Sequence, residues 1–387
     1  MSESSATAQA ITAPAITAPA TSSWFQRYLL PGLAFKAVVI GGGYATGREL
    51  AEFFLPSGPQ GGLLAIVLAM IVWSAVCAVT FCFARITASW NYRTFFTNLL
   101  GPFWVLFEIA YLLFIILILA VFGAAAGAIG EALFGGPNLV GTCCLIASIS
   151  FVAAFGNASV ERLFKWVSFF LYGVYAIFVA LSLFAFGDRI RMNLGVAVPT
   201  HGWVAGGLTY ASYNVVGAVI ILPVLRHLRS SREALIAGAL AGPLAMVPAL
   251  LFFVCMIAFY PNIGAQALPS DFLLRQLNFP VFHFFFQLMI FLALLESGTG
   301  CVHAINERVA QAYAARRGRA LSRSARLCIT GALLIGSIFL AARFGLVTLI
   351  ARGYRGLAYL ILAVFVLPVM TLGLRQIWKT RAPVVTQ

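Results

Sequence analysis

The sequence predicts an all-α polytopic membrane protein with about ten transmembrane helices, arranged as two sets of five in a five-plus-five inverted repeat. Three observations support this prediction. Of the 387 residues, 62% are hydrophobic and only 9% are charged. The apolar residues form separate runs of about 20 residues, the length that crosses a bilayer as a helix. Two of these runs, in matching positions of the two halves, are interrupted by glycine-rich polar stretches.

The composition excludes a soluble protein and points to the lipid bilayer as the solvent. Backbone amides cannot stay unpaired in hydrocarbon, so a chain with many long apolar runs forms a helix bundle. A membrane β-barrel would show alternating apolar and polar residues, which these runs do not.

Charged residues, prolines and glycine clusters divide the chain into spans and terminal tails. The expected spans are 32–55, 62–84, 103–133, 139–156, 161–186, 203–226, 234–260, 279–306, 326–343 and 354–374. Residues 24–200 then form the first repeat and 201–378 the second. Residues 1–23, which lack a signal-peptide pattern, are expected to be a disordered tail, and 379–387 a cytoplasmic tail.

Basic residues set the expected orientation. Most of the 25 Lys and Arg residues fall in segments that are cytoplasmic if the N-terminus is inside, so the positive-inside rule predicts that both termini are cytoplasmic. The expected location is the bacterial inner membrane. The net charge of +14 is explained by this topology, and no nucleic-acid partner is predicted.

The seven cysteines lie in or beside apolar runs without metal-ligand spacing, so we interpret them as packing residues and expect no metal and no cofactor apart from a coupling H⁺ or Na⁺. The sequence does not indicate an oligomeric state. It also shows no enzyme motif such as a nucleophile elbow or a zinc-binding helix, and an enzyme is not expected.

The two interrupted spans carry the predicted binding site. Ten spans in two sets of five require the second set to enter the membrane inverted, and transporters of that plan bind solutes at broken helices. Glycine lowers helix propensity by about 1 kcal/mol, and a glycine cluster in a span frees backbone groups for a ligand. Close helix packing is the alternative. The predicted substrate-binding residues are Gly41, Gly43, Tyr44, Ala45, Thr46 and Gly47 in span 1, and Thr209, Tyr210, Ser212 and Asn214 in span 6.

Ionisable residues inside a membrane are costly and tend to be functional. Glu296 begins a polar stripe along span 8, in which residues recur at steps of three and four. The predicted ion-coupling residues are Glu49, Glu296, Ser297, Thr299 and His303. A hydrated path and a structural seam explain this stripe equally well.

Arg48 and Glu52 are predicted to form a gate. Their i, i+4 spacing also fits a simple ion pair on one helix. Glu49 lies in the first turn after the break, where a carboxylate also complements the helix dipole.

Three segments resemble the YkvI family of bacterial amino-acid permeases: Gly41 to Glu49, Tyr210 to Asn214 and Glu296 to Arg308. In the family, Gln usually stands where this chain has Arg48. The resemblance covers essentially the whole membrane region. It implies the LeuT-type fold of the amino acid-polyamine-organocation superfamily, with the substrate held between unwound helices 1 and 6.

The expected function is secondary transport of a small amino-acid-like or related organic solute by alternating access, driven by a proton or Na⁺ gradient. Amides near Gly43 to Gly47 would receive a carboxylate. The alternative is a membrane receptor or sensor that retains a permease-like ligand site.

Overall fold

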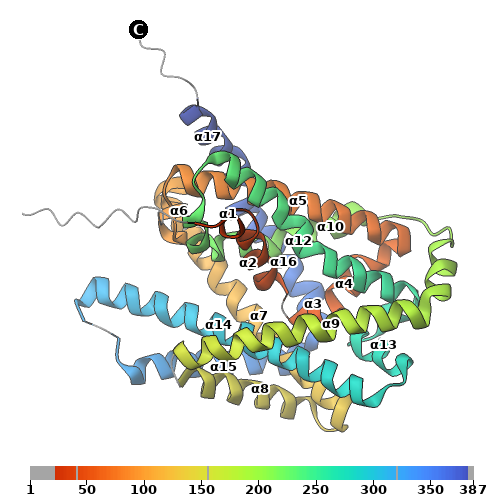
Figure 1. Cartoon of the computed structure of the whole chain (residues 1–387). Coiled ribbons are helices and arrows are strands. Elements are labelled where there is room, and N and C mark those ends of the chain that lie inside the picture. Colours follow the sequence, from red (N-terminus) through yellow and green to blue (C-terminus); the bar gives the residue numbers. More distant parts are fainter. Residues whose placement is uncertain (1–21, 41, 155–156, 320, 382–387) are drawn as a thin grey trace, which may run out of the picture.

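The computed structural model describes residues 22–40, 42–154, 157–319 and 321–381, and Figure 1 shows the whole chain. Every regular element in this part is helical, as predicted. The tail predicted at 1–23 lies almost entirely outside the described residues, and 382–387 lie outside as well.

The helices follow the predicted order of ten traverses. Their bounds are α1 Trp24–Tyr28, α2 Leu30–Val39, α3 Gly42–Ala45, α4 Arg48–Phe53, α5 Gly58–Ile86, α6 Tyr92–Leu100, α7 Trp104–Phe134, α8 Asn138–Ala154, α9 Asn157–Leu194, α10 Trp203–Asn214, α11 Gly217–Ile220, α12 Ser231–Ile257, α13 Pro269–Leu277, α14 Pro280–Arg317, α15 Arg323–Thr348, α16 Arg355–Ile361 and α17 Leu374–Arg381. Short 3₁₀ turns and π-helical stretches lie between them. By length and composition, six helical stretches among the described residues are able to cross a membrane; the other traverses are shorter or broken.

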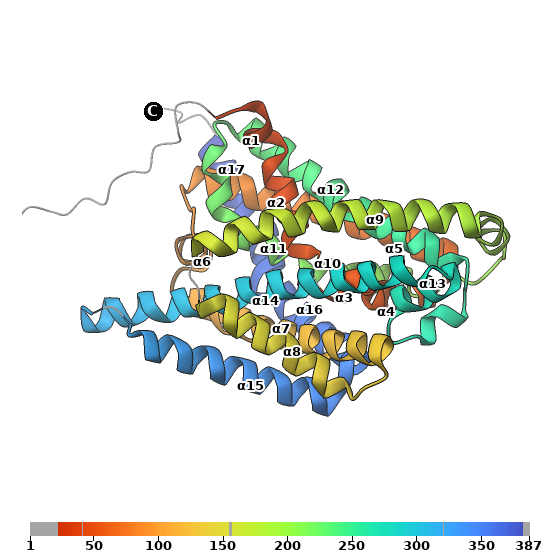
Figure 2. The same ribbon diagram turned by 60° about the horizontal axis from the view of Figure 1, so that its bottom comes forward.

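The traverses pack in two groups. The first, which we call the bundle, contains α2, α5, α10 and α12; α12 packs along α5 and α2, and α10 packs on α5. The second, which we call the scaffold, contains α7, α8, α14 and α15, with α7 against α8 and α15. In Figure 1 the bundle helices α5, α10 and α12 occupy the upper half and α8, α14 and α15 the lower half; Figure 2 shows α14 running between α9 and α7.

The interruption of span 1 is confirmed. Helix α2 ends at Val39, α3 is a single turn, and α4 begins only at Arg48. Gly47 separates α3 from α4 with φ of +76°, a left-handed conformation that side-chain-bearing residues rarely adopt. The backbone of span 1 is therefore irregular next to the polar residues that were predicted from its sequence.

The interruption of span 6 lies later than predicted. Helix α10 runs without a break from Trp203 to Asn214, and the irregular residues are Val215 and Val216. A Cβ on Gly206 would lie 2.1 Å from the carbonyl oxygen of Phe53, so this glycine serves close packing against the end of α4. For this residue the packing alternative holds.

The stretch that separates the last two predicted spans is mostly helical. Between the spans predicted to end at residue 343 and to begin at 354, α15 continues to Thr348 and a π-helix follows over Leu349–Tyr354. The chain is interrupted at Gly345, whose φ is +69°. Arg352, the one arginine between these spans, therefore lies on a helix.

Candidate functional site

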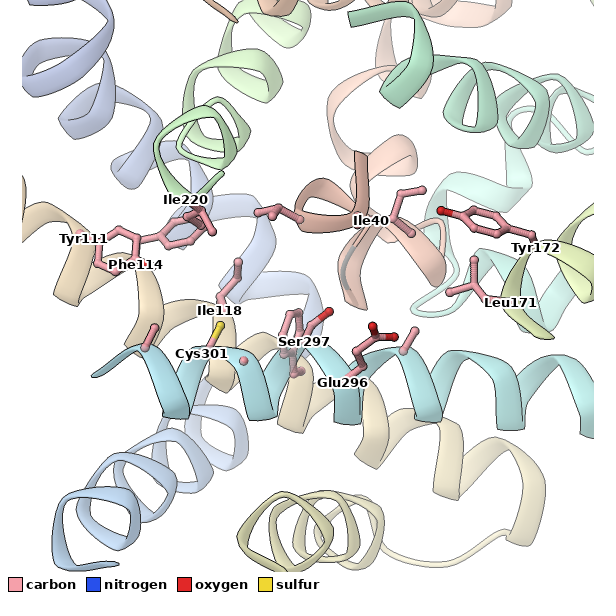
Figure 3. Close-up of a pocket in the computed structure, with 16 residues that line it drawn as sticks. Ile40, Tyr111, Phe114, Ile118, Leu171, Tyr172, Ile220, Glu296, Ser297 and Cys301 are labelled. Carbon is pink, nitrogen blue, oxygen red and sulfur yellow. The ribbon is translucent and has the colours of Figure 1, made fainter. Parts of the chain in front are cut away.

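A cavity of about 280 Å³ lies between the bundle and the scaffold, next to the break in span 1. Ala37, Val38 and Ile40 line it from the end of α2, and Ile220 from the end of α11. The scaffold side is formed by α7 and α14, and Leu171 and Tyr172 of α9 close a further wall (Figure 3). The cavity is thus bounded by both interrupted spans and by the helices that face them.

Glu296 and Ser297 of α14 are the predicted site residues that line this cavity. In Figure 3 the Glu296 carboxylate points away from its helix, toward the space beneath Ile40. Glu296 is half-buried, and no described residue forms a hydrogen bond or an ion pair with its carboxylate. A carboxylate in such surroundings is available to bind a cation or a proton.

The remaining lining is mostly apolar and aromatic. Tyr111, Phe114, Ile118 and Phe122 present one face of α7 to the cavity. Their spacing of three or four residues is helical, but the sequence of α7 is apolar on all sides. No amphipathic pattern marked the inward face, which is why sequence reasoning missed these residues.

A smaller cavity of about 50 Å³ shares Ile40, Leu171 and Tyr172 with the first. Tyr44 and Ala45, both predicted substrate-binding residues, line it. Lys36, which was not predicted, also lines it, and its Nζ lies 4.1 Å from the centre of the Tyr172 ring. Part of the predicted span 1 site therefore borders this second space.

Glu49 lies apart from both cavities in a buried aromatic cluster. Its carboxylate accepts a 2.7 Å hydrogen bond from the hydroxyl of Tyr213 on α10. The Tyr213 ring packs on Tyr210 and on Tyr354, so spans 1, 6 and 10 meet here. Glu49 is only 4% exposed. This carboxylate is enclosed and has a partner.

Arg48 is not directed toward either cavity. Its guanidinium donates to the carbonyl oxygens of Gly264 (2.8 Å) and Gln266 (2.9 Å) and to the Glu52 carboxylate (2.8 Å). Arg355 approaches the other oxygen of Glu52 at 3.8 Å. We call Arg48, Glu52 and the carbonyl groups of Gly264 and Gln266 the clasp. The i, i+4 pair predicted from the sequence is present, and it is tied to the segment between α12 and α13.

Four further residues of span 1 were predicted to bind substrate: Gly41, Gly43, Thr46 and Gly47. The backbone carbonyl of Thr46 accepts a 3.0 Å hydrogen bond from the amide of Ser270, at the start of α13. Gly43 lies within α3, and Gly41 lies outside the described residues. Gly47 forms the left-handed turn described above.

The predicted span 6 residues lie on α10, and neither cavity is lined by them. Ser212 donates to the carbonyl oxygen of Leu208 (2.7 Å), and Asn214 donates to that of Tyr210 (3.2 Å), both within the same helix. Thr209 is half-buried, and the Tyr210 hydroxyl is buried without a partner among the described residues. Their role in binding remains a prediction.

The polar stripe on span 8 divides in the structure. Glu296 and Gly300 face the cavity, whereas the Thr299 hydroxyl donates to the carbonyl of Leu295 in its own helix. His303 is exposed, and Glu307 pairs with Arg326 at 2.6 Å. The stripe is therefore neither a continuous path nor a single seam.

A polar network near the start of α14 was also missed. Asp271 of α13 accepts hydrogen bonds from Arg275 (2.7 Å) and Gln287 (2.9 Å) and contacts His283 Nε2 at 2.7 Å. Asp271 lies in what reads as a loop sequence, between two predicted spans, so only the fold brings it to these partners.

Known proteins resemble this chain in sequence and in fold. The Bacillus subtilis (strain 168) membrane protein YkvI is 23% identical over 280 residues, which cover 72% of this chain and 80% of the relative. The structure of MhsT in complex with L-phenylalanine matches 92% of this chain and 98% of its own, with a TM-score of 0.55 and 15% identity. The chain is similar to YkvI and has the LeuT-type fold.

A second similar structure supports this fold. The Eremococcus coleocola manganese transporter, solved with an aromatic bis-isothiourea compound, matches 92% of the chain and 81% of its own, with a TM-score of 0.53 and 16% identity. No protein-family model matches the chain. The predicted resemblance and the predicted fold class are both confirmed.

Proposed function

We propose that the protein is a secondary active transporter of a small amino-acid-like organic solute, which binds in the cavity between bundle and scaffold. The observation that carries the proposal is the position of this cavity. It borders both interrupted spans and contains a carboxylate without a partner among the described residues. Binding at the meeting point of broken helices is the plan of alternating-access transporters.

The cavity walls favour an apolar organic solute. The rings of Tyr111, Phe114 and Tyr172 form much of the lining, and Glu296 is the one acidic residue among those that line it. A divalent metal is usually held by several carboxylate, carbonyl or imidazole ligands, whereas the polar groups lining this cavity are one carboxylate, the hydroxyls of Ser297, Tyr111 and Tyr172, and the Cys301 thiol. The similar MhsT structure contains L-phenylalanine, which agrees with such a lining.

The arrangement of clasp and cavity fits one state of an alternating-access cycle. The cavity borders the α2 side of the span 1 break, and the clasp joins the α4 side to the segment before α13. In the predicted orientation the α4 side faces outward. Transport then requires the clasp to open and the cavity to close.

We further propose that a proton drives transport and that Glu296 carries it. The carboxylate is half-buried and unpaired among the described residues, so it can gain and lose a proton as the cavity opens and closes. Na⁺ held by Ser297 and span 1 carbonyls is the alternative.

Uptake into proteoliposomes tests the proposed function. Radiolabelled L-phenylalanine and L-leucine are offered to vesicles with an imposed pH gradient, with an imposed Na⁺ gradient, or with neither. Accumulation that requires the pH gradient and the protein is expected. A ligand that raises the melting temperature of the purified protein yet never accumulates would indicate a sensor instead.

A further inference from the structure

A second, larger groove opens on the opposite side of α7 from any predicted site residue. Its volume is about 590 Å³, and it lies between α7, α15 and the π-helical stretch that leads into α16. Leu113, Ile116 and Leu117 of α7 form one wall, and Leu340 and Phe344 of α15 the other. Among the described residues, Arg352 is the one charged residue that lines it.

Arg352 lies beside a helix of membrane-spanning length. A Cβ added to its neighbour Gly353 would lie 2.8 Å from Leu117 of α7, and α7 belongs to a stretch long and apolar enough to cross a membrane. A guanidinium beside such a helix is costly unless an anion or the membrane interface receives it, and the long arginine side chain can extend toward the headgroup region.

Arg352 differs from Arg48 and Arg355 in having no anionic partner in the described part of the chain. Arg48 and Arg355 both contact Glu52. No described carboxylate forms an ion pair with Arg352, and its side chain is exposed at the groove. The charge therefore faces outward, away from the protein's own acids.

The Thr348 hydroxyl and an open space beside Gly356 lie in the same groove as the Arg352 guanidinium. Thr348, Arg352 and Gly356 follow one another at steps of four, and all three line the groove. Nothing lies within 4 Å of a Cβ built on Gly356, so the groove is open beside the guanidinium. A phosphate there would accept hydrogen bonds from Arg352 and from the Thr348 hydroxyl, and charge-assisted bonds of this kind are strong.

We propose that this groove binds one anionic phospholipid, with its phosphate on Arg352 and Thr348 and an acyl chain along Leu113, Ile116 and Leu117. Leu113 and Phe344 in the groove walls are about half exposed, as expected of a lipid-facing surface, and basic pockets between membrane helices bind anionic headgroups. A water-soluble phosphate would leave the apolar walls uncovered, so the walls favour a lipid. The proposal does not depend on the transport function.

The test compares two lipids that share acyl chains and differ in headgroup charge. Detergent-purified protein is titrated with phosphatidylglycerol or phosphatidylcholine, and bound lipid is counted by native mass spectrometry. Phosphatidylglycerol is expected to bind more tightly. Arg352→Gln should weaken its binding about tenfold, the effect of losing one charge-assisted contact, and should remove the preference over phosphatidylcholine.

Matched variants separate the site from general effects of charge and folding. Arg343→Gln removes an exposed arginine of α15 that does not line the groove, and the lipid preference should persist. Leu113→Trp, at a residue that is half exposed, should fill the groove and reduce phosphatidylglycerol binding while the protein stays folded. Equal binding of the two lipids, equal losses in Arg352→Gln and Arg343→Gln, or equally tight binding of free glycerol phosphate would each overturn the proposal.

Discussion

Glu49 and Glu296 are both carboxylates within predicted membrane spans, and the structure gives them opposite surroundings. Glu49 is enclosed by tyrosines and accepts a hydrogen bond from Tyr213. Glu296 faces a cavity, and no described residue pairs with it. A satisfied buried acid holds helices together, whereas an unsatisfied acid at a cavity is free to bind a ligand or a proton. Membrane depth alone, which the sequence shows, does not separate these roles.

The largest effect is expected from Glu296→Gln. This variant should lose pH-driven accumulation of solute entirely but keep counterflow exchange, because the cavity keeps its shape while the titrating group is gone. Uptake and counterflow are measured in the same proteoliposomes. Glu307→Gln, on the same helix but paired with Arg326, is the matched control and should transport normally. Unchanged pH dependence in Glu296→Gln would move the coupling role to Glu49 or to Na⁺.

Arg48→Gln should produce the next largest effect. It removes a guanidinium that holds Glu52 and two backbone carbonyls. Hydrogen bonds of charged groups contribute about 1.5–3 kcal/mol, so the melting temperature should fall and the α4 side should become more accessible. Cysteine labelling at Gln266→Cys, with and without the arginine, measures that access. Equal labelling in the two backgrounds would show that the clasp does not close this side.

Glu49→Ala should lower stability without changing which ion drives transport. The Tyr213 hydroxyl would lose its acceptor in a buried site, at a cost of about 1–3 kcal/mol. Glu49→Gln keeps an oxygen acceptor and should recover most of that loss. Thermal unfolding of both variants checks the prediction. Loss of proton coupling in Glu49→Gln, with normal stability, would give the coupling role to Glu49 and not to Glu296.

Tyr213→Phe should have the smallest effect on transport. It removes the hydrogen bond to the Glu49 carboxylate but keeps the ring contacts with Tyr210 and Tyr354, so destabilisation of about 1.5–3 kcal/mol, the contribution of a hydrogen bond to a charged group, is expected. The unfolding midpoint, compared with that of Glu49→Ala, shows whether the two residues form a single unit. A double variant that loses no more than the worse single variant would confirm the pair.

The sequence was sufficient for the fold because apolar runs and paired interruptions follow directly from the chemistry of a bilayer. It located the break in span 1, where Gly47 requires a left-handed conformation. It misplaced the break in span 6, because Gly206 is small for close packing and not for flexibility, and sequence alone does not distinguish these uses.

The candidate site was predicted only in part for a similar reason. Glu296 and Ser297 were found because a charge in an apolar span is conspicuous. Tyr111, Phe114 and Tyr172 were missed because aromatic residues are common throughout these helices. Which of them face inward depends on how α7 and α9 are rotated against the bundle. Long-range packing determines that rotation, and no local pattern reports it.

The hydrogen bonds that join the span 1 break to the segment before α14 affect how often the two are attached and how often they are detached. The Ser270 amide donates to the Thr46 carbonyl, and Arg48 donates to the carbonyls of Gly264 and Gln266, so residues 264–270 are attached to residues 46–48 at three points. At about 1 kcal/mol for each bond, the attached arrangement is favoured over the detached one by roughly a hundredfold. A protein with this bias is mostly in the state in which this side is closed. Anything that binds from that side must then contribute the free energy for release, so apparent affinity measured from the two sides of the membrane should differ.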